Sequence, residues 1–162
     1  VGGQPQLLAN IEAKHLWSAL RACTLRHCFR DALQAYDHVA SRIGEGSAGI
    51  WSLLLYSAVE TTDFKRCKAF WKRLCSLARP SGQDFVNMVR CYAHWHDVQG
   101  LATFLSELRT SAFQLDCVSR NRALAVCAMS CEMKMAEMIV KDGVCKVPMD
   151  TIAYNTLMKA AS

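Results

Sequence analysis

The residues of this sequence that are able to do chemistry are histidines, cysteines and one basic run. His94 and His96 flank a tryptophan, but residues two apart on a helix point in different directions, so the two imidazoles do not converge. Cys91 and His94 have a spacing compatible with a helix and lack the second ligand pair that a zinc site needs. We therefore expect structural or surface histidines, no metal centre and no cofactor.

The nine cysteines are an odd number, include no Cys-x-x-Cys pair and fall at helix-packing positions. This distribution argues against a disulfide framework and is typical of small apolar residues in a reducing compartment. The sequence has no nucleophile elbow, phosphate-binding glycine loop or zinc-protease motif. We therefore expect no enzymatic activity and no small-molecule substrate.

The densest basic run contains Lys65, Arg66, Lys68, Lys72 and Arg73. On a helix its three lysines share one stripe, which is typical of a solvated outer face. The alternative function is a secondary patch for phosphate or for an acidic protein partner. A net charge of +5 is compatible with a polyanionic partner.

A repeat of 34 or 35 residues positions these side chains. Equivalent positions in the first half of each period are mostly aromatic, and they are Trp17, Trp51, Phe85, Arg120 and Tyr154. Equivalent positions in the second half are small or apolar, and they are Ala32, Cys67, Leu101 and Ala136. Two apolar clusters per period predict a helical hairpin. We expect the aromatic residues of the first series to pack within hairpins, and Arg120 to pack differently.

The period predicts an all-α fold of antiparallel helix hairpins, because nothing alternates with the period of a strand. The expected hairpins span 14–47, 48–81, 82–116 and 117–150, with the first helix of a fifth at 151–162. Residues 1–13 are weakly patterned, and we expect an N-terminal segment or the end of a preceding helix there. No apolar run is long enough to cross a bilayer, so no membrane insertion is expected.

The stretch from Pro148 to Leu157, Pro-Met-Asp-Thr-Ile-Ala-Tyr-Asn-Thr-Leu, resembles the pentatricopeptide repeat family. In that family Pro-x-Asp leads into a helix that begins Val-x-Tyr-Asn-x-Leu-Ile. The segment 116–121 matches again, and the period covers nearly the whole chain. The resemblance implies a right-handed superhelical α-solenoid with a concave groove, and residence in an organelle, either mitochondrion or chloroplast.

The resemblance also implies that single-stranded RNA binds one base per repeat, through the fifth and the last residue of each repeat. Carried over by position, the pairs are Ser18 with Ser47, Ser52 with Ser81, Val86 with Asp116, and Asn121 with Asp150, while Asn155 has no partner. Asn121 with Asp150 is the family's uridine-preferring pair. Val118 and Ile152 match the apolar residues that sandwich the base, and Val86 cannot hydrogen-bond a base edge.

The family often carries a lysine late in the first helix that meets the RNA backbone. The corresponding residues here are Arg26, Glu60, His94 and Met129, which is a poor grip on phosphate. We expect single-stranded RNA binding of the kind used in organellar RNA processing, stability or translation. The alternatives are a protein-interaction scaffold, as in tetratricopeptide repeats of the same period, or a non-catalytic repeat region of a larger protein.

Overall fold

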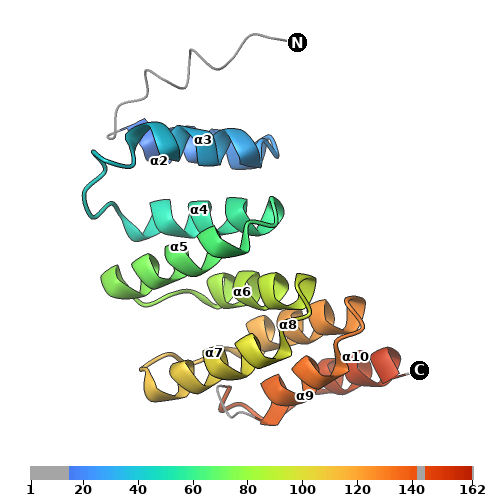
Figure 1. The fold of residues 1–162 in the computed structure, drawn as a ribbon. Helices are drawn as coiled ribbons and strands as arrows, with labels where there is room; N and C mark the ends of the chain where they lie inside the picture. Colours follow the sequence, from blue (N-terminus) through green and yellow to red (C-terminus); the bar gives the residue numbers. More distant parts are fainter. Residues whose placement is uncertain (1–14, 142–144, 162) are drawn as a thin grey trace. The chain divides into compact units, whose positions relative to one another are not determined.

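The computed structural model describes residues 15–141 and 145–161, and this part of the chain is helical without strands (Figure 1). The all-α prediction is confirmed. The expected segment 1–13 and the first residue of the expected first hairpin lie outside the described residues. The helices are α2 (Leu16–Leu25), α3 (Phe29–Val39), α4 (Ala48–Glu60), α5 (Phe64–Leu77), α6 (Gly82–His94), α7 (Val98–Thr110), α8 (Cys117–Met129), α9 (Met133–Lys141) and α10 (Thr151–Ala161).

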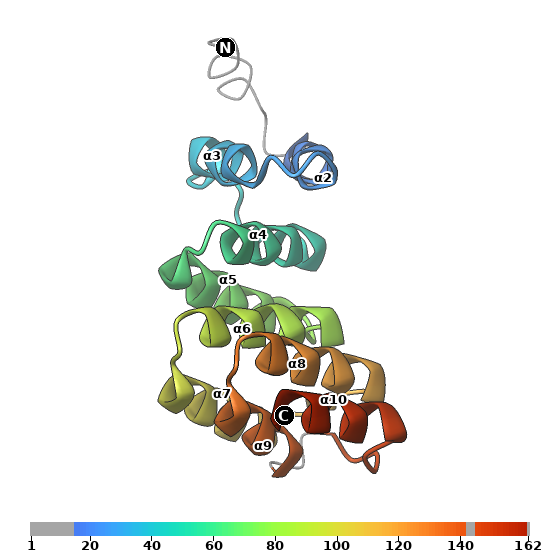
Figure 2. The same cartoon turned by 90° about the vertical axis from the view of Figure 1, so that its right-hand side faces the viewer.

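The chain divides into two compact units, Val1–Arg79 (unit 1) and Pro80–Ser162 (unit 2). In unit 1, α2 packs against α3 and α4, and α4 pairs with α5. In unit 2, α8 lies between α6 and α10, while α7 and α9 pack side by side in a second layer (Figure 2). Within unit 2, therefore, the first helices of successive hairpins form one row and the second helices form another.

The aromatic series that we expect to pack divides into two groups. Trp51 and Phe85 are 4% and 0% exposed, and the Phe85 ring stacks at 5.8 Å from the rings of both Phe104 and Phe113. Trp17 and Tyr154 are instead 41% and 57% exposed. The packing prediction holds for the first two residues and is wrong for the other two.

The same turn joins the two helices of every hairpin. Its left-handed residues are His27, Thr62, His96 and Cys131, with φ between 53° and 58°, at intervals of 35, 34 and 35 residues. In each turn this residue donates its N–H to the carbonyl three residues earlier, and the next residue donates to the carbonyl five residues earlier. This is the Schellman motif, in which glycine usually occupies the left-handed position. The sequence repeat is thus matched by a repeat in backbone geometry.

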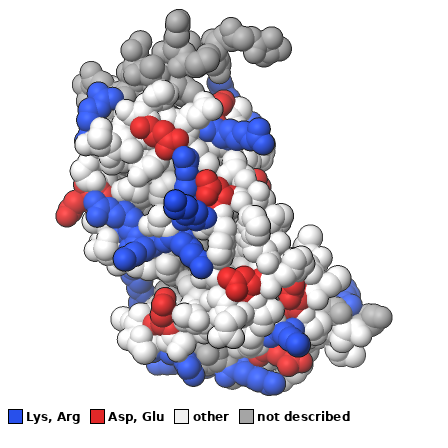
Figure 3. All heavy atoms as spheres, viewed as in Figure 1, with Lys and Arg blue, Asp and Glu red and all other residues white. Residues whose placement is uncertain are grey.

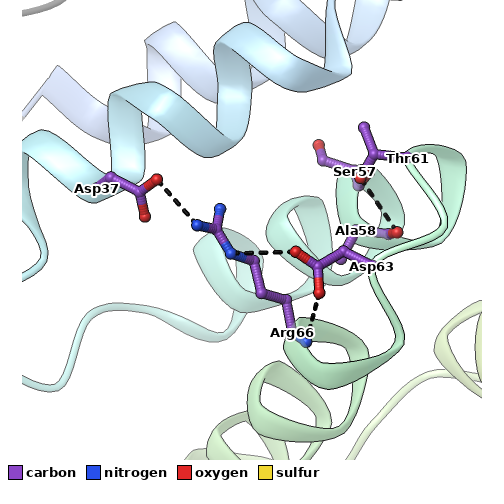
Figure 4. A network of polar contacts seen from close by, with 6 residues as sticks. All are labelled: Asp37, Ser57, Ala58, Thr61, Asp63 and Arg66. Atoms are coloured by element: carbon purple, nitrogen blue, oxygen red, sulfur yellow. Dashed lines mark hydrogen bonds and ion pairs between the residues drawn. The ribbon is translucent and has the colours of Figure 1, made fainter.

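The turn between α4 and α5 also shows how α5 begins (Figure 4). The Asp63 carboxylate caps α5 by accepting a hydrogen bond from the backbone N–H of Arg66 at 3.1 Å. The Arg66 guanidinium then bridges Asp63 at 3.3 Å and Asp37 of α3 at 3.0 Å. The cap of α5 is therefore tied to the preceding hairpin.

Replacing Thr62 with glycine is expected to stabilise the protein by about 0.5–1 kcal/mol. A β-branched residue is strained at positive φ, and glycine is not, although glycine gives back part of the gain through the entropy of the unfolded chain. Urea denaturation followed by circular dichroism measures the change.

The matched control is Thr61→Gly in the same turn. Thr61 has φ of −93°, and its hydroxyl donates to the Ser57 carbonyl at 2.9 Å, so glycine there should destabilise. Destabilisation by both substitutions would show that the left-handed residue carries no strain.

Candidate nucleic-acid interface

The N-terminal ends of α8 and α10 place Asn121 directly beside Asp150. The Asp150 carboxylate caps α10 by accepting a hydrogen bond from the backbone N–H of Ala153 at 2.8 Å. The Asn121 side-chain nitrogen donates to both oxygens of the same carboxylate, at 3.1 and 2.9 Å. Both residues belong to unit 2, and the structure brings together the one pair that matches the motif in full.

The protonation state of Asp150 sets the orientation of the Asn121 amide. The Ala153 N–H, the Asn121 amide and the charge of Arg120 together hold the pKa of Asp150 below its ordinary value. At neutral pH this carboxylate is therefore ionised and only accepts hydrogen bonds, so Asn121 must turn its NH₂ group toward it. The Asn121 oxygen then points the other way and accepts a hydrogen bond from Arg120 Nε at 3.4 Å.

Arg120 is a buried charge that holds the segment before α10. Arg120 is 2% exposed, and its guanidinium donates hydrogen bonds to the carbonyls of Val147 at 2.6 Å and Pro148 at 3.2 Å. These bonds satisfy the charged group inside the protein, as burial of an arginine requires. Arg120 therefore packs differently from Trp51 and Phe85, as the sequence predicts.

Exposed apolar side chains flank the polar pair. Val118 on α8 and Ile152 on α10 occupy the same position in successive helices and are 55% and 65% exposed. Asn155 is also exposed, one turn further along α10. Arg122, on the same helix as Val118, donates to the side-chain oxygen of Gln83 at 3.0 Å. This surface of unit 2 thus combines two apolar residues, one oriented amide and one exposed guanidinium.

The preceding pair of unit 2, Val86 with Asp116, differs from Asn121 with Asp150 in both residues. Val86 is 4% exposed, so it is a core residue with no surface to offer a ligand, which corrects its expected role. Asp116 caps α8 by accepting from the Ser119 N–H at 2.8 Å and from the Ser119 hydroxyl at 2.9 Å. These bonds lower the pKa of Asp116. Asp116 has the same cap as Asp150 but no amide partner.

The remaining expected contacts are spread over the two units. Ser18, Arg26 and Ser47 of unit 1 are exposed, and the Ser47 side chain makes no capping bond to α4. Ser52 is half-buried in unit 1, whereas Ser81 belongs to unit 2 and forms a capping box with Asp84. The structure gives no geometry for a Ser52–Ser81 pair.

Two contacts of this surface are not evident from the repeat pattern. One is the bond between Arg122 and Gln83, which joins α8 to α6. The other is the close approach at Gly82, where an added Cβ would lie 2.0 Å from the Ser119 hydroxyl oxygen. A glycine at the first position of α6 is the only sequence signal for this approach, whereas the Ser-x-x-Asp spacing of residues 81–84 predicts the capping box.

Within residues 15–141 and 145–161, no group of three or more His, Cys, Asp or Glu is arranged to hold a metal ion. The nine cysteines are free thiols, and burial raises the pKa of Cys127 to about 12. None of the described helices has the length and apolar character needed to cross a bilayer. Comparison with protein-family models, curated proteins and solved structures finds no match to this chain.

Replacing Arg120 with methionine is expected to destabilise unit 2 by about 1–2 kcal/mol, because two backbone carbonyls lose a charged donor. The loss should be largest in α10, where amide hydrogen exchange should quicken. Urea denaturation and hydrogen exchange measure the two effects.

Arg122→Met is the matched control, since this arginine is exposed and donates to one surface glutamine. It should change stability by less than about 0.5 kcal/mol. Equal effects of the two substitutions would contradict an anchoring role for Arg120.

Proposed function

We propose that this chain is a pentatricopeptide-like array of helix hairpins that binds single-stranded RNA along its first helices. The observation that carries the proposal is the oriented Asn121 amide, held between Arg120 and Asp150 on a surface flanked by Val118 and Ile152. The right-handed superhelix and a role in organellar RNA processing, stability or translation are the parts of the proposal that come from the resemblance.

The repeat architecture has two supports. The Schellman turn recurs at the period of the sequence motif, at residues 27, 62, 96 and 131. In unit 2, the helices α6, α8 and α10 pack in a row. A row of first helices is the arrangement in which neighbouring repeats present equivalent side chains to one strand of RNA.

Asn121 retains the hydrogen-bonding capacity that a pyrimidine edge requires. Its nitrogen carries two hydrogens, and the two oxygens of the Asp150 carboxylate lie on one side of it and share one of them; its oxygen has two lone pairs, one of which meets Arg120 Nε. A second N–H and a second lone pair therefore serve a base that offers an acceptor next to a donor, as uracil does. Val118 and Ile152 would contact the two faces of that base, and the preference for uridine follows the family.

The electrostatics of unit 2 support binding of modest affinity. Residues 80–162 contain eight basic and eight acidic residues, so the unit has no net attraction for phosphate. Arg122 is exposed on the proposed RNA surface and is the residue there that is suited to a phosphate contact.

A protein-interaction scaffold is the second candidate, and one observation favours it. Ile152, Tyr154 and Met158 of α10 are 65%, 57% and 71% exposed, which is apolar surface of the kind that accepts a partner helix.

Asp150→Asn should weaken binding of an eight-nucleotide oligouridylate by about tenfold, since it removes the ionised acceptor that orients Asn121. Asparagine remains a good N-cap, so α10 should still form. Fluorescence anisotropy at low salt measures the affinity, with oligocytidylate and oligoadenylate as comparison ligands.

Asp116→Asn is the matched control, because it changes an equivalent cap whose partner position holds the buried Val86. It should leave the affinity within twofold. Equal binding of the three oligonucleotides, or equal losses in the two variants, would contradict base contact by Asn121.

A further inference from the structure

The positive charge of this protein is concentrated in unit 1. Residues 15–79 contain ten Lys or Arg against five Asp or Glu, whereas residues 80–162 contain eight of each. Half of the ten lie on α5, which contains no acidic residue. Figure 3 shows the basic side chains gathered on the surface over α5.

The arginines of α5 are held by the protein. Arg66 pairs with Asp63 and Asp37 (Figure 4), and Arg73 donates to the Gly44 carbonyl at 3.1 Å and lies over the Trp51 ring. These contacts fix α5 against α3 and against the segment that precedes α4. They also partly neutralise the charge of the two arginines, so the main role of these arginines is to stabilise the fold.

The lysines of α5 form the outward-facing part of the basic surface. Lys65, Lys68 and Lys72 are exposed and lie on one stripe, about 4.5 and 6 Å apart along the helix axis. The Lys68 ammonium lies 4.3 Å from the centre of the Phe64 ring, which holds it against the helix. Within the described chain, neither Lys65 nor Lys72 forms an ion pair.

This surface offers charge without apolar anchors. The large apolar residues of α5 that pack inward are Phe70, Trp71 and Leu74, and the exposed large apolar residues of the described chain lie outside α3, α4 and α5. A protein partner needs aromatic or aliphatic anchors at the centre of an interface, and a membrane needs an apolar face to bury. A phosphodiester backbone needs only cations, and ammonium groups contact it without regard to sequence.

We propose that the lysine stripe of α5 binds the phosphodiester backbone of single-stranded nucleic acid without contacting its bases. This site does not rest on the Asn121–Asp150 pair, since it uses other residues of another unit. Its binding is governed by release of counterions, so it weakens steeply as salt rises.

The test is the triple variant Lys65→Gln, Lys68→Gln, Lys72→Gln, assayed against oligouridylate, oligocytidylate and oligoadenylate across a salt series. The slope of log affinity against log salt should become shallower by about 2, because each lost phosphate contact removes about 0.7. Affinity at 50 mM salt should fall about tenfold or more, by the same factor for each oligonucleotide. All three lysines are exposed, so the thermal unfolding curve should change by no more than the loss of the Lys68–Phe64 contact causes.

The control is Lys134→Gln, Lys141→Gln, Lys146→Gln, which removes the same charge from exposed positions of unit 2. It should change the salt slope by less than a third of the change that the α5 triple variant causes. Equal slopes in the two triple variants would mean that net charge alone matters, and would overturn the proposal. The proposal would also be overturned if polyglutamate, an acidic peptide, binds this stripe more tightly than the oligonucleotides do.

The two proposed sites fail independently. Asp150→Asn alters the preference among oligonucleotides and should leave the salt slope unchanged. The α5 variant alters the slope and should leave the preference unchanged.

Discussion

One carboxylate, that of Asp150, serves two elements of unit 2, and the proposed RNA surface depends on it. A helix begins with backbone N–H groups that have no partner, and Asp150 satisfies one of them through Ala153. The same group accepts both contacts from Asn121 on the neighbouring helix. Because the last position of a repeat is also the cap of the next first helix, helix capping and orientation of Asn121 are imposed by the same geometry.

This constraint separates Asp150 from the equivalent residues. Ser47 makes no capping bond, Ser81 is committed to Asp84, and Asp116 is committed to Ser119. Among the four complete pairs in the part of the chain that the structure describes, only that of Asn121 has a fifth residue that donates an amide N–H to an ionised cap. Arg120 completes the arrangement by donating to the Asn121 oxygen, so each hydrogen bond of the three-residue series has a defined direction.

The sequence was sufficient to predict the all-α class, because its apolar residues recur at helical spacing and nothing alternates with the period of a strand. The family resemblance implied that Asn121 and Asp150 form a pair, and the structure places the two side chains in contact. The sequence could not predict the turns, because their left-handed positions hold histidine, threonine and cysteine in place of glycine. The exposure of Trp17 depends on which neighbouring element covers this residue, and periodicity does not report that.

The burial of Val86 is a second case in which periodicity does not predict how exposed a residue is. Its position in the period matches Asn121, but an apolar side chain there joins the core, so register identifies equivalent positions and not equivalent exposure. The two units therefore differ in the charge and in the side chains that they expose. Unit 1 has net positive charge concentrated on α5, and unit 2, which has no net charge, has an oriented amide at Asn121.

The central claim is that the Asn121 amide is preoriented by Asp150 and contacts a pyrimidine base. Nuclear magnetic resonance of the Asn121 side-chain NH₂ group during titration with oligouridylate tests it most directly. The account predicts a shift of at least one of the two NH₂ resonances on addition of oligouridylate but not of oligoadenylate. No shift with either oligonucleotide, or identical shifts with both, would contradict it.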